Sequence, residues 1–127
     1  MLFRSAIAGG ASGGDILFHE VCETAKIPAH LYLALPVDGF LISSVQRGGP
    51  RWVARYQRLC ERLVPRVLQD SEALPRWLAD RPGYDVWQRN NLWMMFSALA
   101  TDARRLTLIA LYNPERDPDI RRLRVPA

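Results

Sequence analysis

The sequence predicts an α/β layered domain with a mainly parallel sheet of about four strands. Short apolar runs alternate with segments of helical periodicity along the chain, which is the pattern of strand–helix–strand units. The apolar runs are continuous rather than alternating, as expected for strands that are buried on both faces of a sheet. The 127 residues, 49% of them hydrophobic and 24% charged, suit one compact domain.

The first half of the chain predicts strand, helix and strand. Leu2–Ala8 is a short apolar run that ends at two glycines, as a buried strand entering a tight turn does. From Asp15 to Lys26, apolar residues recur at helical spacing and polar residues take the other face, so we expect an amphipathic helix that ends before Pro28. His30–Val37 is predicted to be the second strand, closed by an Asp-Gly turn signal.

The second half repeats the alternation. Pro50 is predicted to open a helix that runs to Val64, because proline is favoured in the first helical turn. A short third strand is predicted at Arg66–Gln69, followed by a connection over Ser71–Gly83.

A third helix and a last strand complete the prediction. Asp85, with Gln88 three residues later, has the pattern of a capping box, so the helix is expected to run from there to Thr101. Leu92–Ala100 is apolar nearly all round, which predicts a buried helix. Leu106–Tyr112 is predicted to be the last strand.

Composition excludes several classes of protein. No apolar run approaches the roughly 20 residues needed to span a bilayer, and the first ten residues lack the pattern of a signal peptide, so we expect a cytoplasmic protein with no membrane partner. The formal net charge is +4, which would suit an anionic ligand. Cys22 and Cys60 have no CxxC spacing, so neither a metal site nor a disulfide is expected.

The first candidate site is the glycine-rich segment between the first strand and its helix. In a parallel sheet, ligands bind beyond the carboxyl ends of the strands, at helix N-termini. Four glycines would let the backbone approach a phosphate and point amides at it, and a serine adds a hydroxyl; the candidate ligand-binding residues are Gly9, Gly10, Ser12, Gly13, Gly14 and Asp15. The alternative is a turn that serves only helix–strand packing. Asp15 could be the N-cap of the helix, or an anion that binds a ribose hydroxyl or a backbone amide.

Two further groups are candidates for contacts with a ribose or a base. Ser43 and Ser44 follow the second strand, although turn or cap hydroxyls would look the same. Arg89, Asn90 and Asn91 stand at the start of the predicted buried helix, where paired asparagines cost helix propensity. A solvated first turn would explain the asparagines equally well.

Catalytic signals are weak. No Ser/His/Asp or Cys/His set is evident, so we expect no nucleophilic catalysis, and Glu20 and Asp15 are only weak catalytic candidates. Four arginines recur at helical spacing and form an arginine stripe on one helix face: Arg51, Arg55, Arg58 and Arg62. Such a stripe could follow a nucleic-acid backbone. The favoured interpretation is a solvated face whose arginines pair with acidic neighbours.

Three motifs follow one another within residues 4–113, at Gly9–Asp15, Leu35–Phe40 and Arg89–Met94. Together they make the chain resemble the SLOG superfamily, which includes the DNA-processing protein DprA (Smf) and the LOG phosphoribohydrolases. The first is the GGASGGD segment of Gly9–Asp15, within which Gly13, Asp15 and His19 match a Gly-x-Asp-x-x-x-His pattern of DprA. The second is Leu35-Pro36 followed by Asp38 and Phe40, and the third is RNNLWM at Arg89–Met94. The chain is most similar to SLOG-like C-terminal domains of bacterial proteins that carry tetratricopeptide repeats or nucleotide cyclase modules.

The resemblance implies a three-layer Rossmann-like fold over residues 1–113, followed by a charged tail at 114–127. The strand and helix that usually precede the glycine motif are absent here, so an N-terminal truncation is one expectation. The PGGxGTxxE segment of LOG enzymes and the glycine-rich stretch after the last strand are also absent.

The function implied is non-catalytic sensing of a nucleotide or nucleotide-derived signal, such as an ADP-ribose-like ligand, in bacterial signalling or defence, with no required cofactor. The alternatives are a LOG-like hydrolase of the N-glycosidic bond of nucleoside monophosphates and DprA-like nucleic-acid binding. A homo-oligomer or an adjacent partner domain is a further expectation.

Overall fold

The computed structural model describes residues 5–71, 73–101 and 105–109, and within them the predicted α/β architecture is confirmed. Three parallel strands form one sheet in the order β1-β2-β3: Ala6–Ala8, Ala29–Leu33 and Arg66–Val67. Ile7 lies opposite His30 in the first pair, and Tyr32 lies opposite Arg66 in the second. The carboxyl ends of all three strands therefore lie at the same edge of the sheet.

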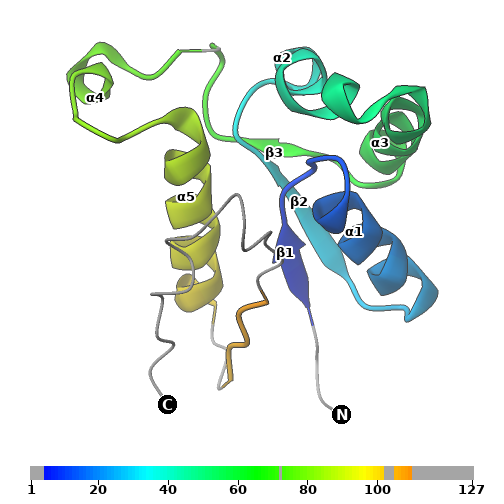
Figure 1. The fold of residues 1–127 in the computed structure, drawn as a ribbon. Helices are drawn as coiled ribbons and strands as arrows, with labels where there is room; N and C mark the ends of the chain where they lie inside the picture. The colour runs from blue at the N-terminus through cyan, green and yellow to red at the C-terminus, as the bar shows by residue number, and fades with distance from the viewer. Residues whose placement is uncertain (1–4, 72, 102–104, 110–127) are drawn as a thin grey trace, which may run out of the picture.

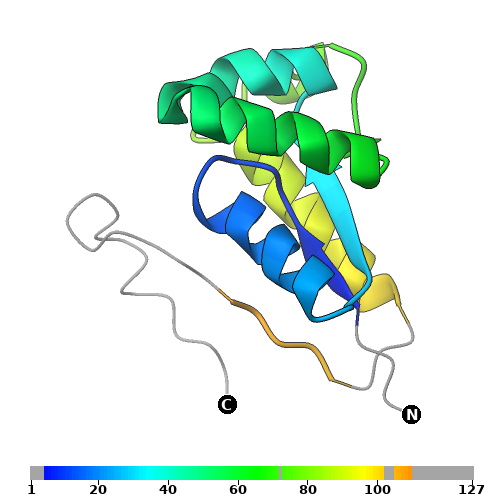
Figure 2. The same ribbon diagram turned by 90° about the vertical axis from the view of Figure 1, so that its right-hand side faces the viewer.

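Helices cover both faces of this sheet (Figures 1 and 2). Helices α1 (Gly14–Thr24) and α3 (Pro50–Arg62) lie on one face, and α5 (Val86–Ala100) lies on the other. Between β2 and α3 the chain forms a short α2 (Val37–Phe40), a π-helical turn η1 (Leu41–Val45) and a 3-10 turn η2 (Gln46–Gly48). This three-layer arrangement places the N-termini of α1 and α3 at the carboxyl edge of the sheet.

The core lies between the sheet and the α1–α3 layer. Its most deeply buried side chains come from α1, β2, η1 and α3, and they include Ile16, Leu31, Leu33, Val45 and Tyr56. The continuous burial of residues 31–35 explains why β2 has no polar alternation.

Helix ends agree with the capping signals. Pro50 is the first residue of α3, where its missing N–H leaves no donor unsatisfied. Asp85 is the N-cap of α5, and its Oδ1 accepts a hydrogen bond of 2.8 Å from the amide of Gln88.

The strands are shorter than predicted. β2 ends at Leu33 rather than Val37, because Pro36 is already the N-cap of α2, and β3 has two residues instead of four. The predicted last strand is wrong over its described part. Residues 105–109 pair with no neighbour, and Leu108 and Ile109 are 68% and 71% exposed. An apolar run needs a hydrogen-bonded neighbour to become a strand, and within the described residues this run has none. Residues 110–112 and the predicted tail at 114–127 lie outside the described residues.

The prediction that α5 is buried is also wrong. The sheet covers only one side of the helix, where the ring of Trp93 packs against that of Tyr32 at a tilt of 52°, with ring centroids 4.5 Å apart. On the other side, Phe96 and Leu99 remain 64% and 60% exposed. Helix α4 (Arg76–Ala79), a single turn within the predicted connection, was not expected.

Candidate functional site

The glycine-rich segment forms the loop between the carboxyl end of β1 and the N-terminus of α1. The loop comprises Gly9–Gly13, and Gly13 is the N-cap of α1 with φ 92° and ψ −124°. Positive φ is unfavourable for a residue with a side chain, and Gly13 has no atom within 4 Å of the position where a Cβ would stand. Glycine is therefore required here by the backbone conformation and not by packing, which leaves open space beside the helix N-terminus.

Four successive amides at this helix start are not hydrogen-bonded. Within the part of the chain that the structure describes, the amide nitrogens of Ser12, Gly13, Gly14 and Asp15 donate to no protein acceptor, and the Gly13 N-cap supplies no side chain. The next two amides are satisfied internally, by the carbonyls of Ala11 and Gly13. Unsatisfied amides and the helix dipole together favour an anion at this position.

Asp15 is not the N-cap of α1. It is the second helical residue, and its Oδ2 accepts a hydrogen bond of 3.2 Å from the amide of Ala11, so it occupies one of the loop amides itself. Burial raises the pKa of this carboxyl, while the Ala11 hydrogen bond, and the His19 ring in its protonated form, act in the opposite direction. The carboxylate thus accepts from the amide of Ala11, and the four amides that follow remain for a ligand.

His19 holds the start of this loop from within the core. Its side chain is fully buried, and Nε2 lies 3.0 Å from the carbonyl oxygen of Gly9 and 3.3 Å from that of Ala8. Carbonyl oxygens only accept, so Nε2 carries the proton and the neutral ring has an unprotonated Nδ1. That Nδ1 is buried without a partner in the described residues. Burial lowers the pKa of His19, and the charge of Arg62 lowers it further. The hydrogen bonds to the two carbonyls and the charge of Asp15 raise the pKa, but they do not outweigh burial.

We expect the protein to lose stability as the pH falls below about 6.5, the ordinary pKa of histidine. The folded state favours neutral His19, so the unfolded chain binds more protons and the stability present above that pH is lost as the pH falls. Urea unfolding at pH 7.5 and 5.5 measures this loss. The variant His19→Gln keeps a donor near Gly9 but does not titrate, so its free energy of unfolding should fall less over that interval. Equal losses in both proteins would contradict the assignment.

Asn90 is brought to the same edge of the sheet from the opposite face. It is 6% exposed, and its Nδ2 donates 3.2 Å to the carbonyl oxygen of Tyr32, near the end of β2. A Cβ on Gly9 would stand 3.6 Å from that carbonyl and 2.8 Å from Asp15 Oδ2. The glycine-rich loop, Asp15 and Asn90 therefore meet at the carboxyl ends of β1 and β2. The Oδ1 of Asn90 is buried without a hydrogen-bond partner among the described residues.

The other candidate binding residues make no hydrogen bond to this group among the described residues. Ser43 and Ser44 lie within the π-helical turn η1, not in an open loop. Arg89 donates from Nη1 to Gln69 Oε1 at 2.7 Å, and Asn91 is exposed on α5. Their adjacency in sequence to a helix start or strand end does not place them at the loop.

Glu20, the weak catalytic candidate, is engaged in an ion pair. Its two carboxylate oxygens accept from Nε and Nη2 of Arg55, which lowers the pKa of Glu20. Arg62 pairs with Glu23 at 3.2 Å. Two members of the arginine stripe thus join α3 to α1, as the solvated-face interpretation expects. The guanidinium of Arg55 also lies 4.3 Å from the ring centroid of Trp52.

A second glycine turn lies beside the first, which the sequence interpretation did not include in the site. A Cβ on Gly48 would stand 2.8 Å from Cβ and Oγ of Ser12 and 2.8 Å from Trp52, so a side chain at Gly48 would separate the two loops. The next residue, Gly49, is the N-cap of α3 with φ 97°. The Gly-Gly-Pro triplet before a helix pattern was the signal that could have found this turn.

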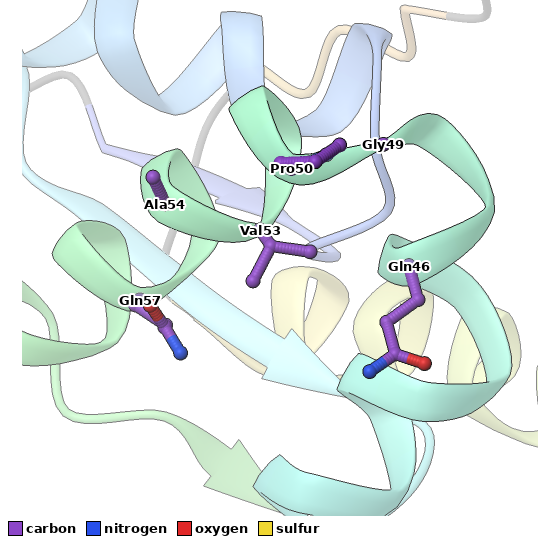
Figure 3. A pocket seen from close by; sticks show the side chains of 6 residues that line it. All are labelled: Gln46, Gly49, Pro50, Val53, Ala54 and Gln57. Atoms are coloured by element: carbon purple, nitrogen blue, oxygen red, sulfur yellow. The ribbon is translucent and has the colours of Figure 1, made fainter.

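An open hollow of about 470 Å³ adjoins this second turn (Figure 3). Its lining comes from η2 and α3: Gln46, Gly49, Pro50, Val53, Ala54 and Gln57. Another hollow, of about 410 Å³, lies between β2 and the C-terminal end of α3, and its lining includes Arg62 and Arg66. Neither hollow includes a residue of the glycine-rich loop.

Metal and membrane features are not found in the described ranges. In residues 5–71, 73–101 and 105–109, no three histidine, cysteine or carboxylate side chains gather as a metal site would require. No helix there is long and apolar enough to cross a membrane.

Comparison of the chain with protein-family models, curated proteins and solved structures finds no match.

Proposed function

We propose that this domain binds a nucleotide or a nucleotide-derived signal such as ADP-ribose and senses it without transforming it, in a bacterial signalling or defence context. The observation that carries the proposal is the run of four amides, Ser12 to Asp15, that donate to no acceptor among the described residues. They lie at the carboxyl end of a parallel strand, where α/β sheets bind phosphates. The resemblance to the SLOG superfamily agrees with this choice of ligand.

The charges around the loop also favour an anionic ligand. The stretch from Gly39 to Cys60, which contains the second glycine turn, holds no aspartate or glutamate and four arginines. Asp15, in the first turn of α1, is the one acidic residue of the segment Gly9–Asp15, and its carboxylate accepts a hydrogen bond from the Ala11 amide. A ribose hydroxyl can donate to such a carboxylate, so Asp15 suits the sugar of a nucleotide while the amides suit its phosphates.

The two alternative functions receive less support. Hydrolysis of an N-glycosidic bond assisted by Glu20 would need this carboxyl to accept or deliver a proton, whereas both its oxygens are bound by Arg55 and its pKa is lowered. Nucleic-acid binding through the arginine stripe would have to break the pairs of Arg55 with Glu20 and Arg62 with Glu23.

Calorimetry and thermal unfolding with AMP, ADP, GDP and ADP-ribose test the proposal. A nucleotide present at about 100 times its dissociation constant should stabilise the fold by about 2.7 kcal/mol. The expected rise in melting temperature is roughly 10 °C. The nucleotide should be recovered unchanged after incubation. If no nucleotide of the panel binds at millimolar concentration, the proposed function is wrong; if free base is released, the hydrolase alternative replaces it.

A further inference from the structure

The hollow beside the second glycine turn has the composition of a subsite for a flat, polar-edged ring. Val53 and Pro50 supply apolar surface, and Gln46 and Gln57 lie on either side of Val53 (Figure 3). At about 470 Å³, the hollow falls within the range of small-molecule sites. Both glutamines are exposed and line the hollow, and no hydrogen bond of either carboxamide is found within the described residues. Their donors and acceptors are therefore available to a ligand.

A carboxamide matches the edge of a purine. It presents one acceptor oxygen and two N–H donors side by side, which can pair with the adjacent N6 donor and N7 acceptor of adenine. An apolar wall contacts the faces of such a ring while polar groups at the rim bind its edge. The pair of glutamines around Val53 supplies this combination without any charged side chain in the lining.

The hollow and the glycine-rich loop are joined through one contact. Gly49 lines the hollow, and its neighbour Gly48 packs against Ser12, the first of the four residues with unpaired amides. A molecule that fills the hollow with one end can thus reach the N-terminus of α1 with the other by crossing the Gly48–Ser12 contact. Arg47 and Arg51 are exposed on either side of the Gly48–Gly49–Pro50 turn, so the path between the two ends is basic.

From this arrangement we propose that the hollow lined by Gln46, Val53 and Gln57 holds the purine base of the bound nucleotide, with adenine as the best match. This inference rests on the proposed function, because it takes the α1 amides as the phosphate site. It assigns the base to η2 and α3. The asparagines of α5 and the serines of η1, which the sequence singled out, are then not base contacts.

The test compares ADP with inorganic pyrophosphate, which carries the phosphates without a base. In the wild-type protein, ADP is expected to bind about 10-fold or more tightly than pyrophosphate. In the double variant Gln46→Leu/Gln57→Leu, the affinity for ADP should fall about 10-fold, while that for pyrophosphate should stay within about 2-fold. Gln88→Leu is the matched control, since Gln88 is an exposed glutamine on α5, outside the hollow. It should change neither affinity.

The outcomes separate the two proposals. If the double variant binds ADP as tightly as the wild type, or if ADP and pyrophosphate bind equally well to the wild type, the base is not in this hollow and the proposed function stands alone. If neither ligand binds the wild-type protein, the proposed function itself fails. Because both glutamines are exposed, the double variant should keep the wild-type melting temperature, and this is measured first.

Discussion

Replacing Tyr56 with alanine is expected to lower the free energy of unfolding by about 3–5 kcal/mol, the largest effect that we predict for a single substitution. The ring is 1% exposed, packs in the main core and stacks on Phe40 with centroids 5.8 Å apart. Its hydroxyl donates 2.9 Å to the carbonyl oxygen of Val37. The alanine variant therefore leaves a cavity between α3 and α2. It also removes one of the hydrogen bonds to the Val37 carbonyl, which still accepts from the amide of Leu41.

The variant Tyr56→Phe separates these two effects. It keeps the ring and removes only the hydroxyl, so it should cost about 1 kcal/mol. Urea unfolding of the three proteins measures both differences. If the alanine variant were no less stable than the phenylalanine variant, the packing of Tyr56 against Phe40 would contribute nothing and the described core would be wrong.

Replacing Gly14 with proline is expected to weaken nucleotide binding by about 10- to 100-fold, the loss of one hydrogen bond from an amide to a charged phosphate. Gly14 is the first residue of α1, where proline is well tolerated, and α3 already begins with Pro50 after a glycine N-cap of positive φ. The substitution therefore deletes one of the four amides without removing a hydrogen bond of the helix. Calorimetry with ADP measures the effect.

Gly14→Ala is the matched control for this prediction. It changes the same position but keeps the N–H, so its affinity for ADP should remain close to that of the wild type. Both variants should unfold at similar temperatures in the absence of ligand. Equal affinities in the proline and alanine variants would mean that this amide does not contact the phosphate.

The sequence predicted the order and type of the main elements because local signals determine them. The capping pattern of Asp85 and the position of Pro50 gave the starts of two helices correctly, and the apolar run after His30 gave β2. The run at 106–109 had the same local signal and is not a strand in the structure. A strand forms only where a second strand lies beside it, and the residues of the run do not determine whether one does.

The candidate site was predicted only in part for the same reason. The glycine-rich loop and Asp15 lie where the strand–helix pattern placed them, and Asn90 approaches them across the sheet. The role of Asp15 as acceptor of the Ala11 amide depends on a side-chain rotamer, and the contact between Gly48 and Ser12 joins residues 36 positions apart. Neither is encoded by a local pattern, and both change the expected shape of the site.

We propose that the amides of Ser12 to Asp15 bind the phosphates of a nucleotide, and amide NMR during a titration with ADP observes these four groups individually. We expect the largest, saturable shifts of amide signals to fall on Ser12, Gly13, Gly14 and Asp15, whereas the signal of Gly83, a positive-φ glycine in the turn after α4, should not move. Shifts that saturate elsewhere while these four signals stay in place would contradict it.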